Sequence, residues 1–476
     1  MKFLVILICL TLIFPAEKAF CIWPDDPELN LPICMAAGTQ EHPRITTDGA
    51  SGAIIVWQDI ASVSSDIYAQ RVDARGEIRW TIDGVAVCLE KKNQWFPNLV
   101  SDGSGGAIIA WWDERNANPN LNSDTDIYAQ RINGEGQVQW EPGGVPVCTL
   151  PRAQLEFNIA ADGEGGALIV WHDYRDETWT PYIYAQRVNK YGEMLWEKDG
   201  ILVASKDNSQ QYPDIASDGY GGAIIVWQDW RDGKGDVYAQ RISAEGEKIW
   251  KYDGIPLCQM PERQWHPYII NDGFGGAIVA WMDHRNSIKN EFISRADNSS
   301  DSGWDIYTQR INAQGKSLWQ ENGIPLCLMG GDQYDYTMIS DGEGGAFVTW
   351  LDQRKGDWDI YGQRLNSSGK YEWKENGIPV CDEPDNQFNP NIVSDGVDGS
   401  IISWWDRRIL DGDIYAQRID KSGNFLWVES GAAICLAKGT QQDPHPINSG
   451  IGSAIIVWWD KREIDANIYA QRVISE

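Results

Sequence analysis

The chain has 476 residues, 42% of them hydrophobic, which is enough for a large buried core. Its 69 acidic and 40 basic residues give a formal net charge of −29. This charge argues against nucleic acid or an anionic membrane surface as a partner, and leaves neutral, cationic or calcium-bridged ligands.

Residues 1–21 have the pattern of a secretory signal: a lysine, an apolar run, and then small residues at possible cleavage positions. The run is too short to span a membrane, and no other transmembrane candidate follows it. Cys21 would suit N-terminal lipidation, although the bulky Phe20 precedes it. We therefore expect residues 22–476 to form one secreted, periplasmic or cell-surface domain.

The hexapeptide Asp-Ile-Tyr-Ala-Gln-Arg at residues 66–71 recurs seven more times with its tyrosine and its Gln-Arg pair unchanged. The eight tyrosines are Tyr68, Tyr128, Tyr184, Tyr238, Tyr307, Tyr361, Tyr415 and Tyr469. A segment repeated at a nearly fixed interval indicates one supersecondary unit stacked on copies of itself. The chain is therefore expected to form one closed array instead of two or three separate domains.

One repeat, residues 97–148, contains four strand-like segments. Residues 98–101 are followed by an Asp-Gly and Gly-Gly hairpin signal, and residues 107–111 form an uninterrupted apolar run. The third segment is 126–132, and the fourth is 136–148. Four antiparallel strands in a unit of about fifty residues are typical of a β-propeller blade.

The second-strand tryptophan occurs in eight copies: Trp57, Trp111, Trp171, Trp227, Trp281, Trp350, Trp404 and Trp458. The fourth-strand tryptophan occurs seven times within the array, and the last copy stops after its third segment. The missing strand is found at the other end, in residues 23–34. We therefore predict an all-β, eight-bladed β-propeller of four-stranded antiparallel blades, closed by an N-terminal strand that completes the last blade.

Residues that recur from blade to blade are expected to be framework, and they include Trp57, Tyr68, Gln70, Arg71, Trp80, Gln94, Asp113 and Arg115. Antiparallel pairing would set Trp57 opposite Tyr68. Arg71 should be buried between blades and needs a carboxylate partner, for which the Asp of Trp-x-Asp, such as Asp59 or Asp113, is a candidate. A catalytic group is normally needed once, whereas these residues recur around the ring.

Seven cysteines occupy one repeat position: Cys34, Cys88, Cys148, Cys258, Cys327, Cys381 and Cys435. Equivalent positions on neighbouring blades should lie beyond the ~7 Å between Cα atoms that a disulfide allows. We therefore expect buried free thiols that pack as small apolar residues.

When the repeats are compared, the only segment that changes in length is the loop between the second and third strands. Insertions that all fall on one face of a repeat protein usually mark its binding face. The loops between the fourth strand and the next first strand should emerge on the same face. Aromatic residues gather in both kinds of loop, and those predicted to bind ligand are Trp95, Trp265, Trp179, Trp230, Trp304, Trp358, Tyr334 and Phe388. Flat aromatic surface suits a sugar ring or a protein loop, and the alternative is that these residues fill gaps between loops.

The chain has none of the motifs of metalloproteases, phosphate-binding loops or Gly-x-Ser-x-Gly hydrolases. Asn298, Asp301 and Asp305, or Asp124 and Asp126, could bind calcium, but no spacing matches an EF-hand loop. Neither another cofactor nor a catalytic residue is predicted. A pair of carboxylates that catalyses glycoside hydrolysis is not excluded by the sequence, because among 69 acidic residues some pair will lie at a suitable distance by chance.

The spacing Gly-x-x-x-Trp, as in residues 76–80 and 136–140, is similar to the end of the tryptophan-docking motif of PQQ-dependent dehydrogenases, whose propellers also have eight blades. The rest of that motif and the adjacent cysteine pair of those enzymes are absent. Nearly the whole chain after the signal more closely resembles secreted bacterial repeat proteins with the pattern Asp-Gly-x-Gly-Gly, Trp-x-Asp-x-Arg, Asp-Ile-Tyr-Ala-Gln-Arg and Gly-x-x-x-Trp. That resemblance implies a propeller fold and export, and no activity.

We interpret the chain as an exported binding module, expected to be a monomer, that recognises a glycan or an extracellular protein through the face carrying these loops. One alternative is a glycoside hydrolase or polysaccharide lyase acting on the same face. Another is a scaffold protein of the cell envelope. Binding is favoured over catalysis.

Overall fold

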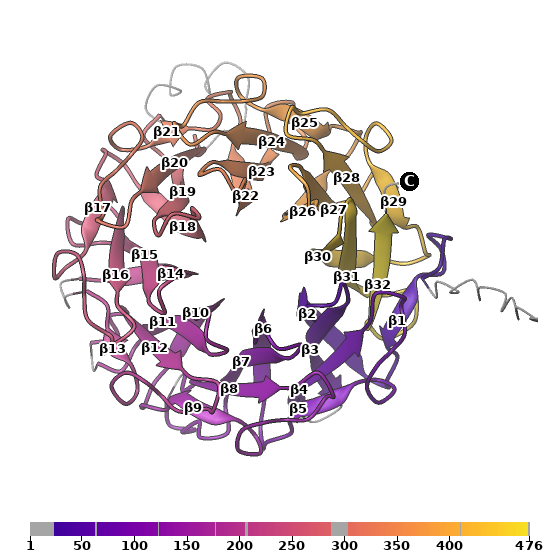
Figure 1. The fold of residues 1–476 in the computed structure, drawn as a ribbon, viewed down its shortest axis with the longest axis horizontal. Coiled ribbons are helices and arrows are strands. Elements are labelled where there is room, and N and C mark those ends of the chain that lie inside the picture. The colour runs from indigo at the N-terminus through magenta and orange to yellow at the C-terminus, as the bar shows by residue number, and fades with distance from the viewer. Residues whose placement is uncertain are drawn as a thin grey trace, which may run out of the picture.

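The computed structural model describes residues 23–61, 64–121, 123–176, 178–204, 208–286, 303–409 and 411–474. Eight four-stranded antiparallel sheets form the blades of a closed ring (Figure 1). This confirms the predicted fold class and blade number. Residues 1–21, which include Cys21, lie outside the described residues, as do Asn298 and Asp301.

The strands occupy corresponding places in the eight blades. The first, innermost strands are β2 (Thr39–Thr47), β6 (Gln94–Ser101), β10 (Gln154–Ala161), β14 (Gln210–Ser217), β18 (Gln264–Asn271), β22 (Gln333–Ser340), β26 (Gln387–Ser394) and β30 (Gln441–Gly450). The second strands are β3 (Ala53–Ala61), β7 (Ala107–Asp113), β11 (Ala167–Asp173), β15 (Ala223–Asp229), β19 (Ala277–Asp283), β23 (Ala346–Asp352), β27 (Ser400–Asp406) and β31 (Ser453–Asp460). The third strands are β4 (Ser64–Val72), β8 (Asp126–Ile132), β12 (Tyr182–Val188), β16 (Asp236–Ile242), β20 (Asp305–Ile311), β24 (Asp359–Leu365), β28 (Asp413–Ile419) and β32 (Asn467–Ile474). The fourth strands are β5 (Val85–Cys88), β9 (Val145–Cys148), β13 (Ile201–Leu202), β17 (Ile255–Cys258), β21 (Ile324–Pro325), β25 (Ile378–Cys381), β29 (Ala432–Cys435) and β1 (Leu31–Cys34).

The N-terminal strand closes the ring, as predicted. β1 pairs antiparallel with β32, with Leu31 opposite Ala470, and the last sheet has the order β1-β32-β31-β30. In Figure 1, β1 is the outer strand of the last blade, beside the first blade. The structure contains no described helix that is long and apolar enough to cross a membrane.

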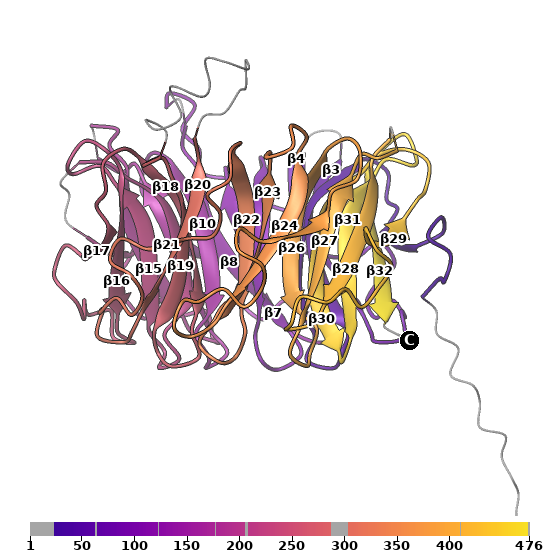
Figure 2. The ribbon, with the colours of Figure 1, turned by 90° about the horizontal axis from the view of Figure 1, so that it is seen from above.

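The strand register defines two faces of the ring, which Figure 2 shows edge-on. Gln94 lies opposite Asp113, and Asp113 lies opposite Asp126, so both kinds of variable loop emerge at one end of the strands. We call this end the loop face. At the other end Ser101 lies opposite Ala107, and hairpins and tight turns connect the strands there. We call that end the turn face.

Aromatic pairs fill the middle of each blade. Trp57 lies opposite Tyr68, as predicted, and their ring centres are 6.4 Å apart. All eight second-strand tryptophans are fully buried. Burying an indole removes a large apolar area from water, so these residues are the main hydrophobic contribution of each blade.

Three strand boundaries of the second blade differ from the sequence prediction, and one of them is the end of the second strand, which continues to Asp113 instead of stopping at residue 111. In the second blade the first strand begins at Gln94 instead of residue 98, because a β-bulge between Trp95 and Asn98 allows the pairing to continue. The fourth strand is only Val145–Cys148, because the residues before it form turns and touch the sheet through a single bridge at Val138.

The glutamine of the Gln-Arg pair fixes the turn within its own blade. Gln70 Nε2 donates to the carbonyl of Thr81 at 2.7 Å. Gln70 Oε1 accepts from the backbone N–H groups of Arg71 at 2.9 Å and Trp80 at 3.1 Å. The side chain is fully buried and its amide nitrogen and oxygen are both bonded, so the position is framework.

The arginine of this pair does not contact the carboxylates proposed for it. Arg71 pairs with Asp48, in the hairpin between the first and second strands, at 2.9 Å. The prediction of Asp59 or Asp113 was wrong, because both lie at the loop face, whereas Arg71 lies near the turn-face end of its strand. The aspartate of the Asp-Gly hairpin therefore has two roles: it closes the hairpin and it neutralises the arginine.

The aspartate of Trp-x-Asp instead forms a second network at the loop face. Asp113 accepts from Trp111 Nε1 at 2.8 Å and pairs with Arg115 at 2.6 Å. The Arg115 guanidinium lies 3.8 Å from the ring centre of Tyr128 and 3.2 Å from Cys88 Sγ of the preceding blade. All seven cysteines after the predicted signal are free and buried, as predicted, and burial raises the pKa of Cys88 to about 12.

The interface between neighbouring blades, here called a seam, repeats one contact. Trp80 Nε1 and Arg71 Nη1 both donate to the carbonyl of Gly134 in the turn of the next blade, at 3.0 and 2.9 Å. Gly136, two residues later, leaves room for the Trp80 indole. The corresponding acceptors of seven seams are the carbonyls of Ala74, Gly134, Lys190, Ala244, Ala313, Ser367 and Lys421.

A matched pair of substitutions tests this seam contact. Gly136 has φ +80° and an added Cβ would lie 2.8 Å from Trp80 Cγ, whereas Gly163 has φ +81° and open space around it. Both Gly→Ala variants should lose about 1 kcal/mol for the left-handed backbone. Gly136→Ala should lose a further ~1–3 kcal/mol through overpacking, measured by denaturant unfolding. Equal losses would show that the glycine serves its backbone conformation only.

Candidate functional site

The aromatic residues predicted to bind ligand lie at the loop face, and most are half-buried between blades. Trp265 and Trp304 have ring centres 5.8 Å apart, and His284 lies 4.7 Å from Trp304. Tyr334 lies 5.6 Å from Trp358. The structure therefore brings four of the predicted residues together as two pairs, each packed against the buried core of a seam.

Two further predicted tryptophans are accompanied by arginines. The Arg263 guanidinium lies 4.9 Å from the ring centre of Trp230 and 5.3 Å from that of Trp265, so it links these two residues. Trp179 is 42% exposed and lies 4.8 Å from the guanidinium of Arg152. Cation–π contacts of this kind can hold an indole at the surface.

The remaining two predicted residues each pack against another aromatic residue of their own blade, and Phe388 also contacts the core cluster that Tyr334 and Trp358 cover. Phe388 packs 5.2 Å from Trp405 in its own blade. Trp95 lies opposite Trp112 in the sheet register and is half-buried. The eight predicted residues thus share one face without converging on one cavity.

A different set of residues surrounds the axis of the ring. Each first strand has a glutamine at or next to its start, such as Gln94 in β6. Two positions after this glutamine, the β-bulge holds one non-glycine residue in the left-handed conformation, with φ between 45° and 58°. These residues are His42, Phe96, Glu156, Tyr212, His266, Asp335, Asn389 and Asp443. Because the first strands are innermost (Figure 1), the eight residues encircle the axis, and we call them the bulge ring.

The bulge ring carries side chains that this backbone conformation disfavours. The left-handed region suits glycine and is tolerated by Asn, Asp and His, yet three of the eight residues are Phe96, Glu156 and Tyr212. Each of these costs on the order of 1–3 kcal/mol. The sequence analysis did not identify this ring. Its signal is a variable residue enclosed between the fixed glutamine and the proline that follows in six of the eight copies.

Two neighbouring cavities lie along one arc of the ring. A cavity of about 340 Å³ is lined by His42, Phe96 and Glu156. A second, of about 300 Å³, is lined by Glu156, Tyr212 and His266. Glu156 belongs to both cavities, so the two form a continuous concave surface across neighbouring blades.

Burial raises the pKa values of several carboxyl groups near the axis. The pKa of Asp214 rises to about 7, although its carboxylate accepts a hydrogen bond from the backbone N–H of Ile269 at 2.8 Å. Burial and the negative charge of Asp443 raise the pKa of Asp335 to about 6, and burial raises that of Glu156. Glu156 and Asp335 are nevertheless exposed to water.

Asp443 is the exception among these acids. It pairs with Arg44 at 3.2 Å and lies 3.0 Å from Nε2 of His445. Burial alone would raise the pKa of Asp443, but His445 and Arg44 together lower it. Burial and Arg44 lower the pKa of His445, so Arg44 is the cation that neutralises Asp443 near neutral pH.

The described residues contain no group of three or more His, Cys, Asp or Glu side chains that could hold a metal ion. Asp124 accepts from the backbone N–H groups of Asn118 and Arg152, each at 2.6 Å. Asp126 accepts from the Asn116 amide at 2.7 Å. These two acids, predicted as possible calcium ligands, therefore already take part in the hydrogen bonds that order their loop.

No family model matches the chain, and no curated protein matches it. Structural similarity was found to a protein of unknown function from Dyadobacter fermentans, with 8% identity, TM-score 0.44, and coverage of 94% of this chain and 99% of that one. An ulvan lyase has 11% identity, TM-score 0.48, and coverage of 78% and 90%. An α-L-arabinanase from Penicillium chrysogenum has 13% identity, TM-score 0.37, and coverage of 71% and 97%. Similarity at this level carries no argument about activity.

The raised pKa of Asp214 predicts a pH-dependent stability. Its folded pKa of about 7 exceeds the unfolded value of ~3.9, so its stabilising contribution is complete below about pH 4 and is lost as the pH rises through 7. Asp214→Asn should therefore unfold at higher urea concentration than the wild type at about pH 8, and at a similar concentration at about pH 4. Each unit of pKa shift corresponds to about 1.4 kcal/mol.

The control for this experiment is Asp443→Asn. The pKa of Asp443 is lowered on folding, so its contribution is present above ~3.9 and this variant should be less stable than the wild type at about pH 8. Stability changes of the same sign for both variants would contradict the assignment.

Proposed function

We propose that this protein is an exported glycan-binding module whose ligand lies against the bulge ring, with the loop-face aromatic residues extending the site. The bulge ring is the observation that carries this proposal. Framework positions are nearly constant around the propeller, whereas these eight differ in chemistry from blade to blade. Side chains kept in strained backbone conformations are typical of ligand-binding sites.

The chemistry of the two cavities suits sugar units. Glu156 and His266 can exchange hydrogen bonds with hydroxyl groups, and Phe96 and Tyr212 offer aromatic faces. Trp265 lies 5.7 Å from Tyr212, so one of the loop-face tryptophans continues this aromatic wall. The net charge of −29 favours a neutral or cationic glycan over an acidic one.

The size of the cavities favours a glycan over a protein loop. Cavities of about 340 and 300 Å³ that meet at Glu156 could each take a small ligand unit. A stable protein interface normally involves about 20–30 residues on each partner. Only nine residues line each of these two cavities. A chain of at least two sugar units would follow the arc from His42 to His266.

Glu156→Gly tests the proposal because it separates binding from stability. Removing the side chain should weaken binding to neutral glycans, identified on an array and measured by calorimetry, by about tenfold, which is ~1.4 kcal/mol. The same substitution should raise the free energy of unfolding by about 1 kcal/mol, because glycine relieves the left-handed strain.

Two controls accompany this variant. Glu41→Gly, in a first strand but with ordinary backbone, should lose stability and keep binding. The double variant Trp95→Ala/Trp265→Ala tests the loop-face aromatic residues separately. Unchanged binding by Glu156→Gly and by a Tyr212→Ala variant would remove the bulge ring from the site, and binding to protein but to no glycan would change the ligand class.

A hydrolase or lyase is a second candidate, favoured by the contrast between two acids of the ring. The pKa of Asp335 is raised to about 6 and that of Asp443 is lowered, and such a separation is typical of an acid and its ionised partner. If so, Asp335→Asn should abolish release of reducing ends from neutral polysaccharides, and wild-type activity should fall above about pH 6. Asp398→Asn is a control at an exposed acid outside the ring.

A further inference from the structure

Among the described residues, one seam of the propeller has no counterpart of the turn that covers the other seven. Between the seventh and eighth blades, Trp427 and Arg418 take the places of Trp80 and Arg71. Arg418 still pairs with Asp395, the aspartate of its own hairpin, at 2.7 Å. Among the described residues, neither Trp427 Nε1 nor Arg418 Nη1 has a hydrogen-bond acceptor.

The reason is the place of this seam in the permuted ring. In other blades the turn that supplies the carbonyl follows the third strand, as Gly134 follows β8. The third strand of the eighth blade is β32, and the described residues end with it at Ile474. Its fourth strand, β1, comes from the other end of the chain, so no described turn crosses onto Trp427.

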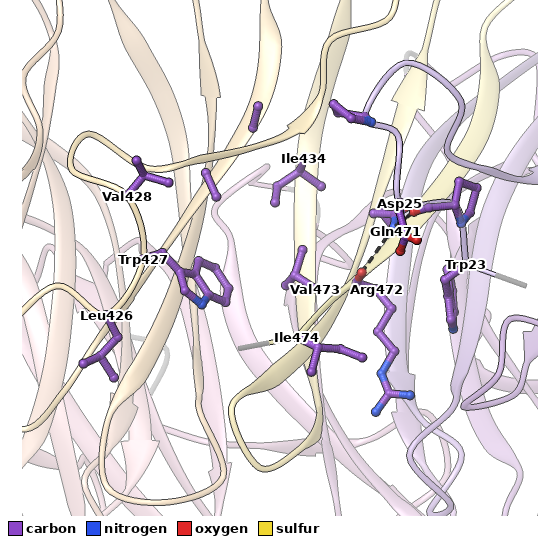
Figure 3. Close-up of a pocket in the computed structure, with 14 residues that line it drawn as sticks. Trp23, Asp25, Leu426, Trp427, Val428, Ile434, Gln471, Arg472, Val473 and Ile474 are labelled. Carbon is purple, nitrogen blue, oxygen red and sulfur yellow. Dashed lines mark hydrogen bonds between the residues drawn. The ribbon is translucent and has the colours of Figure 1, made fainter. Parts of the chain in front are cut away.

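An apolar groove of about 630 Å³ occupies this seam. Figure 3 shows Trp427 facing Val473 and Ile474 across it, with Ile434 beside them. We call this groove the open seam; it is lined by Leu426–Val428, Ala432–Ile434 and Gln471–Ile474, and by Trp23, Pro24, Asp25 and Pro27 of the N-terminal segment.

Two exposed residues of the open seam are apolar where most of the other copies are polar. Val428 is 68% exposed and Ile474 is 56% exposed. The residues at the position of Val428 are Thr81, Glu141, Glu197, Lys251, Gln320 and Lys374, with Pro24 in the eighth blade. Those at the position of Ile474 are Asp73, Asn133, Asn189, Ser243, Asn312, Asn366 and Asp420. Exposed apolar side chains at otherwise mostly polar positions are typical of a surface that another polypeptide covers.

A third difference enlarges the groove. Ala432 is the fifth residue after Trp427. In the first six blades the fifth residue after the corresponding tryptophan is larger, and these residues are Val85, Val145, Ile201, Ile255, Ile324 and Ile378. An added Cβ on Gly315 would lie 2.9 Å from Ile255 Cδ1, so this side chain normally fills the space beneath the turn of the next blade. Alanine leaves that space open to a larger side chain.

We propose that the open seam binds a polypeptide segment of a partner protein, in the manner in which the other seams bind their own turns. The bound segment places a backbone carbonyl on Trp427 Nε1 and Arg418 Nη1, a glycine or small residue on the indole, and an apolar side chain beside Ala432. The seven internal seams are the template for this contact. The proposal is independent of glycan binding, because the open seam lies away from the bulge ring.

A peptide taken from the chain itself provides the probe. A fluorescein-labelled peptide with the sequence of residues 72–80 contains the carbonyl of Ala74 and the glycine that contact Trp23 and Arg472 at the ring closure. We expect saturable binding to the full chain in fluorescence anisotropy. A peptide with Gly76→Val should bind about tenfold more weakly, because a β-branched residue disfavours the left-handed turn.

Variants that restore the residues of other blades locate the binding. Ala432→Ile and Val428→Thr should each weaken peptide binding by about tenfold, or ~1.4 kcal/mol, and preserve the folded ring. Trp427→Phe keeps an aromatic ring but loses the N–H donor, and should also weaken binding. Val397→Thr is the matched control, because Val397 is a 60% exposed valine outside the groove.

Three outcomes would overturn the proposal. The first is no saturable binding of the peptide at millimolar concentration. The second is equal binding by the wild type and Ala432→Ile, which would place the peptide elsewhere. The third is a concentration-dependent dimer in light scattering that Val428→Thr abolishes, which would make a second copy of the chain the occupant.

Discussion

The ring depends on one repeated contact, in which an indole N–H and a guanidinium of one blade donate to the same carbonyl of the next. The arginine is fixed by a carboxylate of its own hairpin: Arg71 pairs with Asp48, whose side chain is fully buried. Removing either partner of a buried ion pair leaves an uncompensated charge, which commonly costs 3–5 kcal/mol. Three motifs that appear unrelated in sequence, Asp-Gly-x-Gly-Gly, Gln-Arg and Gly-x-x-x-Trp, are therefore parts of a single interaction between blades.

The eighth blade shows what happens when that interaction is incomplete. Its hairpin has Ser449 where the others have aspartate, and Arg472 donates to the carbonyl of Ser449 and to that of Ala74 in the first blade. Trp23 donates to the same carbonyl of Ala74, so the ring closure keeps the shared acceptor and loses the carboxylate. Completing a blade with a strand from the other end of the chain thus preserves one seam and leaves its neighbour without a turn.

The sequence predicted the fold because the repeat makes its registers visible: Trp57 opposite Tyr68 follows from counting residues along two strands. It did not predict the partner of Arg71, because Asp48 becomes its neighbour only when the length of each strand is known. The bulge ring was missed for a related reason. A bulge shifts the register by one residue. The glutamine and proline around His42 mark a variable position, but they do not show that the register shifts there. The location of the variable loops was predictable, whereas their convergence on a cavity was not.

The framework and the variable positions are separated in space, and this separation is what allows a symmetric fold to present an asymmetric surface. The repeated indole and guanidinium contacts between blades lie near the turn face. At the loop-face end of each innermost strand only the glutamine is constant, and the two residues after it vary from blade to blade. Five consecutive ring positions, from His42 to His266, are aromatic, basic or long-chained, while Asp335, Asn389 and Asp443 are short and polar. A ligand on the axis would therefore meet an aromatic arc on one side and a polar arc on the other, which defines one preferred orientation in an otherwise eightfold ring.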